Sequence, residues 1–116
     1  MVEVARVALL RKRAGEVARV WPLLAAGHGP GWTAAFAAWA ARRPTLGSLR
    51  DGWDLARELA GLGTLPAMAG RELAVREATT RYDGRSEPRG RRGPALGRAA
   101  GCVAVQIAGR VRLIRG

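Results

Sequence analysis

The sequence contains very few of the residues that build metal centres and disulfides. Its 116 residues include one cysteine, Cys102, and one histidine, His28. A single cysteine excludes an intramolecular disulfide, and together these two residues cannot form a four-ligand zinc site of the usual kind. No apolar run is long enough to cross a bilayer, and the first residues lack the pattern of a secretory signal. We therefore expect a cytoplasmic protein with no cofactor, no metal of its own and no membrane anchor.

Aromatic residues and lysine are also scarce. Aromatic residues make up 5% of the chain although the hydrophobic fraction is 48%, and much of that fraction is alanine. Alanine buries little area, so the expected core is thin unless a partner covers one face of the molecule. The formal net charge is +11, and Lys12 is the one lysine. Residues 78–116 hold nine of the twenty basic residues but only two of the nine acidic ones, which predicts an acidic partner, either nucleic acid phosphate or an acidic protein or peptide.

Apolar residues spaced by threes and fours predict a helical domain over residues 1–82. The first helix covers residues 2–20 and includes Val4 and Val7 among its apolar positions. Pro22 removes a backbone donor and should end or kink this helix. The whole chain then predicts a mainly α fold, in which a small bundle of four to five short helices is followed by a basic arm and a C-terminal β-hairpin.

After Pro22, Leu23–Ala26 should start a new helical turn, and the next helix should begin at Trp32. A glycine-rich turn at residues 27–31 lies between them. It contains His28, which we expect to be a solvated turn residue because no nucleophile or carboxylate lies near it in the sequence. The helix that follows should end before Pro44. Its shared face is predicted to consist of Trp32, Ala35, Phe36, Trp39 and Ala40.

The last two helices carry recognisable end signals. Ser48 is a predicted N-cap with Asp51 as its capping-box partner, and Gly61 and Gly63 should end that helix. Its predicted buried stripe is Leu49, Trp53, Ala56 and Ala60. Thr64 is a second N-cap candidate, and its helix should run to about Thr80. The inner side of that helix is predicted to include Leu65, Met68, Ala69 and Leu73, with Glu72 and Val75 as further candidates. The acids Asp54, Glu58, Glu72 and Glu77 form no defensible carboxylate pair and are predicted to be mostly helix-surface charges.

The character of the chain changes after Tyr82. Residues 83–101, the basic arm, combine arginine with glycine, proline and serine, a composition typical of an extended linker. Residues 102–116 alternate apolar and other residues around a tight turn at Ala108-Gly109, which predicts a β-hairpin. A lone hairpin is marginal in water, so it should pack on the helices or add to the sheet of a partner. Cys102, at the start of the hairpin, is expected to act as a small buried apolar residue.

Two tryptophans and the arginines of the C-terminal third are the candidate contact residues. Tryptophan often anchors interfaces, although the spacing of Trp32, Trp39 and Trp53 equally fits the inner faces of packed helices. Arginine pairs bidentately with carboxylate or phosphate. The predicted contact residues for a partner or peptide are Trp39, Trp53, Arg81, Arg85, Arg89, Arg91, Arg92, Arg98, Arg110 and Arg112.

A set of short motifs occurs in one order between Val20 and Tyr82. These motifs are Val20-Trp21-Pro22-Leu23-Leu24, a glycine-containing turn, the spaced aromatics Trp32, Phe36 and Trp39, the loop from Arg43-Pro44 to Ser48-Leu49, and Leu65-Pro66 ahead of Leu73-Ala74-Val75-Arg76-Glu77. In this order the chain resembles the N-terminal domain of the HvfC/BufC family, which has carried the label of a putative DNA-binding domain. The match covers roughly half of the chain, and the basic arm and hairpin have no counterpart in it. The chain looks like a compact actinobacterial relative.

The resemblance implies a partner subunit. Proteins of this family are similar to the partners of multinuclear non-heme iron-dependent oxidases of TIM-barrel type, which modify ribosomally made precursor peptides. The partner holds the oxidase, engages the leader of the precursor, or does both. The iron would belong to the oxidase. We therefore expect a non-catalytic adaptor with no cofactor.

Two other classes of function compete with an adaptor. A DNA-binding protein of helix-turn-helix type fits the net charge and the loop between the second and third predicted helices. The helix from Ser48 nevertheless offers a mixed face with the acids Asp51, Asp54 and Glu58, whereas a recognition helix should be mostly basic and polar towards the groove. A stand-alone enzyme would need a nucleophile–base pair or a metal cluster, and the sequence predicts neither. Residues 27–31 follow no strand and lack a lysine-Ser/Thr end, so they are no phosphate loop.

Overall fold

The structure, a computed structural model, describes residues 2–90, 95–99, 102–107 and 110–115. Between residues 91 and 116 it describes the backbone of the strands and the side chains of Val111 and Leu113. The helices are α1 (Val2–Val20), α2 (Pro22–His28), α3 (Trp32–Ala40), α4 (Ser48–Leu62) and α5 (Ala67–Thr79), with a 3-10 turn η1 (Gly29–Gly31) between α2 and α3. The prediction of a mainly helical fold is confirmed.

Within the described residues, two antiparallel sheets follow the helices. The first pairs β1 (Thr80–Arg81) with β2 (Arg89–Gly90). The second has the strand order β3-β4-β5 and consists of β3 (Ala95–Ala99), β4 (Cys102–Ile107) and β5 (Arg110–Arg115). The predicted C-terminal hairpin is therefore present as β4 and β5. The sequence did not predict β3, which lies within the basic arm and pairs with β4.

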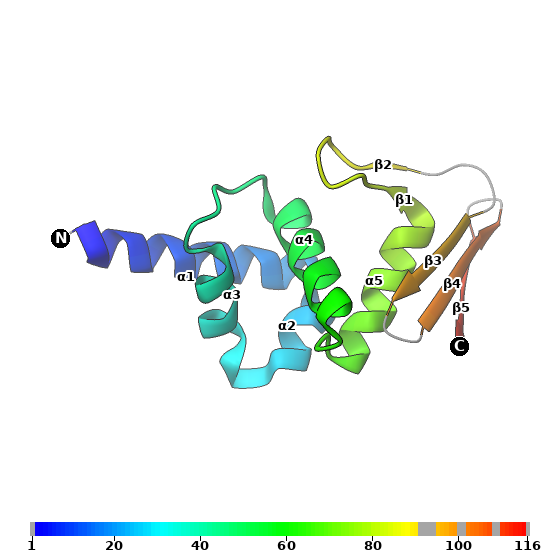
Figure 1. The fold of residues 1–116 in the computed structure, drawn as a ribbon, viewed down its shortest axis with the longest axis horizontal. Helices are drawn as coiled ribbons and strands as arrows, with labels where there is room; N and C mark the ends of the chain where they lie inside the picture. The colour runs from blue at the N-terminus through cyan, green and yellow to red at the C-terminus, as the bar shows by residue number, and fades with distance from the viewer. Residues whose placement is uncertain (1, 91–94, 100–101, 108–109, 116) are drawn as a thin grey trace.

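Helix α1 gives the molecule its length. The molecule measures 51 × 26 × 22 Å, and α1 extends away from the other helices towards the N-terminus (Figure 1). Helices α2, α3 and α4 contact α1, whereas α5 contacts α2, α4 and all three strands of the larger sheet. The sheet therefore lies at the opposite end of the molecule from the free end of α1 (Figure 1).

Aromatic side chains fill most of the core volume. Trp21, Trp53 and Phe36 are fully buried, and the rings of Trp21 and Trp53 meet edge to face with centroids 5.8 Å apart. Such edge-to-face contacts add to the area that the rings bury. The indole N–H of Trp21 donates to the carbonyl of Leu49 at 3.0 Å, and the indole N–H of Trp32 donates to the carbonyl of Ala14 at 3.0 Å. The few large rings thus compensate for the many alanines around them.

Several predicted core positions are instead exposed. Val4 is 74% exposed and Val7 is 49% exposed, because the first turns of α1 extend beyond the helices that cover its second half. Ala35 is also exposed, and so is Met68 near the start of α5. Periodicity identified α1 correctly as a helix, but it could not show that the apolar residues of α1 pack against the core only from Leu10 onward.

The predicted N-caps are wrong at both positions. Helix α4 is capped by Gly47, at a φ of 97°, and Ser48 is its first residue. Asp51, predicted as the capping partner, is buried and accepts hydrogen bonds from the backbone N–H of Leu46 at 3.0 Å and the hydroxyl of Thr45 at 2.7 Å. Asp51 therefore orders the loop before α4 instead of forming a capping box with Ser48.

The predicted end of α4 is confirmed, and the predicted start of the next helix is displaced. Gly63 ends α4 in the left-handed conformation, at a φ of 73°, where glycine pays no steric penalty. The backbone N–H of Thr64 then donates to the carbonyl of Leu59 at 2.9 Å, so Thr64 completes the end of α4 rather than capping α5. Pro66 is the N-cap of α5.

Glu72 connects two helices instead of lying on the surface. Its carboxylate accepts the backbone N–H groups of Leu23 at 3.0 Å and of Leu24 at 2.8 Å. These donors lie in the first turn of α2, where N–H groups have no partner within the helix and a negative charge is favoured. Glu72 of α5 therefore caps α2 across 48 residues of sequence. Of the two predicted positions for Glu72, the inner side of the helix and the surface, the structure shows the inner one.

Gly52 allows α4 to approach Trp21, and its replacement tests how much the core depends on this contact. A Cβ at position 52 would lie 2.6 Å from Nε1 and 2.7 Å from Cγ of Trp21, and closer still to Cδ1. We expect Gly52→Ala to lower the free energy of unfolding by about 1–3 kcal/mol, the usual cost of overpacking a core. Chemical denaturation measures this loss.

Gly61 supplies the matched control in the same helix, because a Cβ there meets nothing within 4 Å. Gly61→Ala should raise the free energy of unfolding by about 0.5–1 kcal/mol through helix propensity. Equal effects of the two variants would show that the contact with Trp21 is not a tight one.

Candidate functional site

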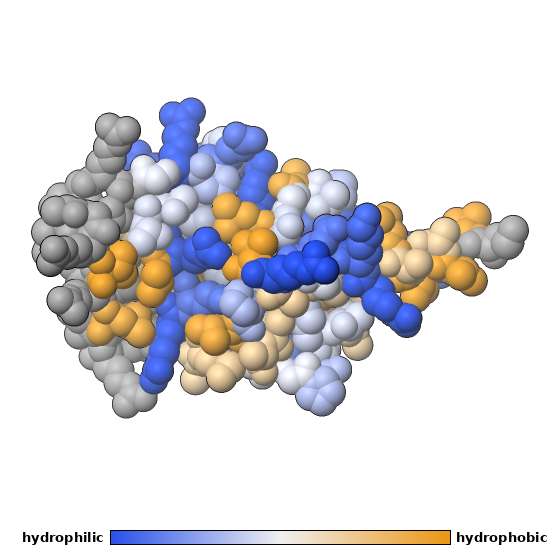
Figure 2. Space-filling view, turned by 180° about the vertical axis from the view of Figure 1, so that it is seen from behind, coloured by the Kyte–Doolittle hydropathy of each residue, from blue (hydrophilic) through white to orange (hydrophobic). Residues whose placement is uncertain are grey.

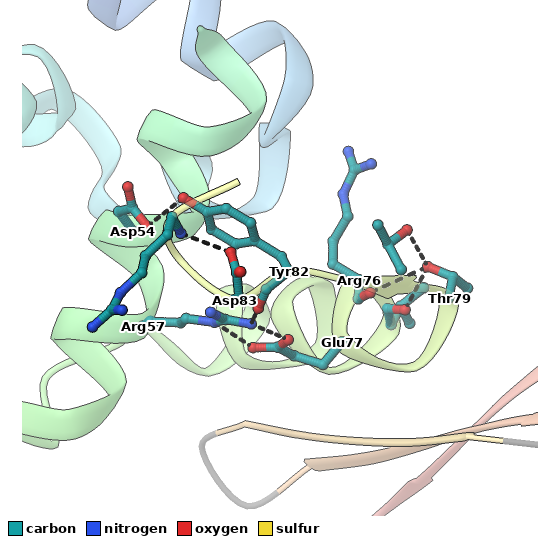
Figure 3. A network of polar contacts seen from close by, with 10 residues as sticks. Asp54, Arg57, Arg76, Glu77, Thr79, Tyr82 and Asp83 are labelled. Carbon is teal, nitrogen blue, oxygen red and sulfur yellow. Dashed lines mark hydrogen bonds and ion pairs between the residues drawn. The ribbon is translucent and has the colours of Figure 1, made fainter. Parts of the chain in front are cut away.

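A polar cluster fixes the start of the β1–β2 hairpin to α4 and α5 (Figure 3). Arg57 of α4 donates to both carboxylate oxygens of Glu77, at 2.8 and 2.7 Å, and to the carbonyl of Tyr82 at 2.6 Å. Its guanidinium carbon also lies 4.9 Å from the centre of the Tyr82 ring. The hydrogen bonds to Glu77 raise the pKa of Arg57, so this side chain stays charged. A bidentate pair of this kind links the two helices with defined geometry.

Tyr82 is the buried end of this cluster. Its side chain is 5% exposed, and its ring centre lies 4.9 Å from that of Trp53. The phenol donates to Oδ1 of Asp54 at 2.8 Å (Figure 3). Burial raises the pKa of Tyr82, and the hydrogen bond and negative charge of Asp54 raise it further, while Arg50 acts in the opposite direction. The chain is thus tied to the helical core at the point where the basic arm begins.

Asp83 orders the first turn of the basic arm. Its Oδ1 accepts the backbone N–H groups of Arg85 and Ser86, each at 2.8 Å, and its Oδ2 accepts the hydroxyl of Ser86 at 2.8 Å. The hydrogen bonds from Ser86 and Arg85 hold the pKa of Asp83 well below its usual range. Arg50 of α4 donates to the carbonyl of Arg85 at 2.7 Å. Residues 83–86 therefore form a turn attached to α4, which the composition of the arm did not predict.

Three predicted contact arginines lie on the β1–β2 hairpin. Arg81 and Arg89 are directly opposite each other in the ladder, both are exposed, and Arg85 is exposed in the turn between them. Like charges at opposite positions repel. A hollow of about 340 Å³ lies between Arg81, Asp83, Ser86, Glu87 and Arg89. Its two acids partly balance its two arginines, so the hollow is not a strongly basic site.

The other predicted arginines belong to the three-stranded sheet or lie outside the described residues. Arg98 is in β3, while Arg110 and Arg112 are in β5. Because β4 lies between these strands, Arg98 and the pair in β5 are on opposite edges of the sheet. Arg91 and Arg92 fall outside the described residues. The predicted arginines that fall within the described residues therefore lie on the β1–β2 hairpin and on the two edge strands of the larger sheet.

The two predicted contact tryptophans differ in accessibility. Trp53 is 0% exposed, so its predicted role as a contact residue is wrong for this conformation. Trp39 is half-buried beneath the guanidinium of Arg43, which lies 4.5 Å from the centre of a Trp39 ring. Its indole N–H is buried and has no hydrogen-bond partner among the described residues. Trp39 remains a partly covered side chain at the edge of the core.

His28 is not the solvated turn residue that we expected. It is the last residue of α2, half-buried, with Nδ1 2.8 Å from the carbonyl of Leu24 and the centre of its ring 5.3 Å from that of Trp32.

Cys102 begins β4, and its side chain is not among those described. Within the described part of the chain, no three or more His, Cys, Asp or Glu residues come together as metal ligands. No described helix has the length and hydropathy required to span a membrane.

The exposed valines of α1 are the surface feature that the sequence analysis missed. Val2, Val4, Val7 and Leu9 are all exposed on the first turns of this helix. One signal was present in the sequence: the apolar positions of residues 2–20 are interrupted by a run of arginine and lysine at residues 11–13. That signal does not reveal which part of the helix lacks a partner.

The comparison with known families shows which family the first half of the chain resembles. Residues 1–61 match the family described as SCO6045-like, C-terminal domain. The chain belongs to this family. The match covers α1 to α3 and all of α4 except its last residue, and it ends before α5 and both sheets. The family description names a domain and states no activity. Searches of curated proteins and of solved structures find no match to the chain.

Tyr82 provides a spectroscopic test of the cluster because it is the one tyrosine of the chain. We expect its phenol to titrate above the ordinary value of about 10. The raised pKa of Tyr82 contributes stability that is fully present below the ordinary value and is lost as the pH rises through the raised one. Ultraviolet absorbance of the phenolate, followed together with circular dichroism, measures both effects.

Asp54→Asn should lower the titration midpoint of Tyr82, because it removes the negative charge that disfavours the phenolate. Glu58→Gln is the control, since Glu58 pairs with Arg43 instead and is not among the groups that shift Tyr82. An Asp54→Asn midpoint equal to that of the unchanged protein would contradict the assigned cause.

Proposed function

We propose that this chain is a non-catalytic, cytoplasmic adaptor that binds an extended acidic segment of another polypeptide along strand β5. The observation that carries the proposal is the position of β5 at an edge of the three-stranded sheet. This strand contains Arg110, Arg112 and Arg115. An edge strand offers main-chain donors and acceptors to an added strand, and arginines beside it favour acidic side chains.

The helical core supports the sheet that carries this edge. Helix α5 contacts β3, β4 and β5, and Val111 of β5 is half-buried against the core cluster. Leu113, two residues further along the same face of the strand, is 43% exposed. A binding edge held on a folded base loses less conformational entropy on binding than a free hairpin would. Leu113 then offers an apolar contact on the face that it shares with Val111.

The resemblance to the HvfC/BufC family supports a more specific form of the proposal. In that form the partner is a multinuclear non-heme iron-dependent oxidase of TIM-barrel type, and the bound segment belongs to a ribosomally made precursor peptide, with its leader as the candidate segment. The motif order between Val20 and Tyr82 carries this resemblance. The chain would contribute binding and presentation, and the oxidase would contribute the iron and the chemistry.

The position of α4 disfavours the competing helix-turn-helix function. Asp51, Gly52 and Trp53 are buried within this helix. Arg50 donates to the carbonyl of Arg85, and Arg57 is paired with Glu77. A recognition helix must present several polar side chains to the base edges of a groove. In helix α4 both arginines instead make contacts within the protein. This arrangement supports a polypeptide partner over sequence-specific binding of duplex DNA.

Charge reversal in β5 tests the proposed binding edge. We expect Arg110→Glu/Arg112→Glu to weaken binding of a fluorescent, extended glutamate-rich peptide by about tenfold or more, because attraction becomes repulsion at the rim of the site. Fluorescence anisotropy across a salt series measures the affinity. Hydrogen exchange should show added protection of β5 amides, but not of α1 amides, when the peptide binds.

Arg19→Glu/Arg42→Glu is the matched control, because both residues are exposed and the net charge changes equally. Equal weakening by both double variants would show that binding follows total charge alone. Sequence-selective binding of a duplex that is unaffected by the β5 variant would favour the nucleic-acid alternative.

A further inference from the structure

The free end of α1 is a second surface that the proposed peptide site does not use. Every residue from Val2 to Leu9 is exposed, although this stretch contains three valines and a leucine. Figure 2 shows these hydrophobic side chains gathered on the end that projects from the body of the molecule. Valine is a poor helix former, and short helices without tertiary support are marginal in water. The projecting turns therefore gain stability if another surface covers them.

One face of this projecting segment is already held by the rest of the chain. Arg6 donates to the carbonyl of Ala41 at 2.6 Å, and Arg13 donates to the carbonyl of Arg43 at 3.0 Å. These two contacts attach α1 to the end of α3 and to the loop after it. Another face, rotated away from Arg6, remains open and forms a shallow groove lined by Glu3, Val4, Val7, Ala8 and Arg11. We call these five residues the α1 face.

The charges on the α1 face are arranged symmetrically. Glu3 lies four residues before Val7, and Arg11 lies four residues after it. If two such helices pack antiparallel about a two-fold axis near Val7, Glu3 of each helix lies at the same height as Arg11 of the other. Two ion pairs then flank a small apolar centre made by Val4, Val7 and Ala8 of both helices. A surface that complements itself in this way is what an isologous two-fold interface requires.

We propose that the α1 face binds the α1 face of a second copy of this chain, with the two helices antiparallel. Charge complementarity selects a second copy, because the face carries both members of each ion pair and needs no other partner to supply them. The arginines of strands β3 and β5 add little repulsion to this pairing, since the sheet lies at the far end of a 51 Å molecule (Figure 1). Residues 2–20 themselves hold five basic and two acidic residues, so repulsion between the two helices limits the strength of the dimer. The pairing goes beyond the proposed peptide site and does not depend on it.

The dimer should be weak and sensitive to salt. A helix face of three turns is smaller than the roughly 800 Å² per partner that a standard stable interface buries. Exposed ion pairs contribute modestly, and salt screens them. Sedimentation equilibrium of the full chain from micromolar to millimolar concentration should therefore show a reversible monomer–dimer equilibrium that shifts towards monomer as the salt concentration rises.

Two single charge reversals test the arrangement. Glu3→Arg and Arg11→Glu each turn two attractive pairs into two repulsive ones. The dissociation constant of the dimer should therefore rise by about tenfold or more in each variant alone. An equimolar mixture of the two variants should form a heterodimer at least as well as the unchanged chain, because every facing pair is then opposite in charge. Lys12→Glu is the matched control: it makes the same charge change one residue away, outside the α1 face, and should leave dimerisation unchanged.

Cross-linking tests the direction of the helices. In a Cys102→Ser background, Glu3→Cys and Arg11→Cys variants mixed together should form disulfide-linked heterodimers faster than either variant links to itself. Preferential 3–3 and 11–11 links would show parallel helices and overturn the proposal. A chain that stays monomeric at millimolar concentration, or a Lys12→Glu effect as large as that of Arg11→Glu, would overturn it as well. Circular dichroism shows that each variant is folded, and peptide binding, measured separately, should be unchanged by all of them.

Discussion

The close contact between α4 and Trp21 is the constraint on which the rest of the fold depends. Gly52 lets the backbone of α4 approach the face of Trp21, and the indole of Trp21 then donates to the carbonyl of Leu49 in the same helix. Trp53, one residue beyond Gly52, meets Trp21 on one side and Tyr82 on the other. One contact therefore connects the end of α1, the centre of α4 and the start of the β1–β2 hairpin. In a chain with so few large side chains, alanines alone would not provide this connection.

Helix α5 extends this core in two directions. On one side, Glu72 caps the first turn of α2, and Arg76 donates to the carbonyl of Val20 at 2.7 Å. On the other side, α5 contacts the three-stranded sheet. The family match ends within α4, so α5 is the element that joins the matched helices to the sheet. A peptide-binding role for the sheet would therefore depend on a helix whose Glu72, Arg76 and Glu77 make contacts within the fold.

The two surfaces that we propose lie at opposite ends of the molecule. The α1 face mixes apolar side chains with one acid and one base, whereas the edge of β5 is basic. Their separation means that pairing at α1 would leave both β5 edges of a dimer free. Such a dimer would present two edges to a partner with two binding segments, which increases the effective concentration of the second segment after the first has bound.

The sequence by itself determined the helices, their approximate ends and the C-terminal hairpin, because proline, glycine and the spacing of apolar residues act locally. It also placed Trp53 in a buried stripe correctly. It could not distinguish Val17, which is buried, from Val4, which is exposed, since both have the same local pattern and only the length of the neighbouring helices separates them. The roles of Asp51, Glu72 and Asp54 were likewise decided by tertiary structure, because their partners lie on other elements or in loops. The same reason divided the arginines between a hairpin and two sheet edges: strand order is a long-range property, and only the pairing of β3 with β4 shows that β5 is at an edge.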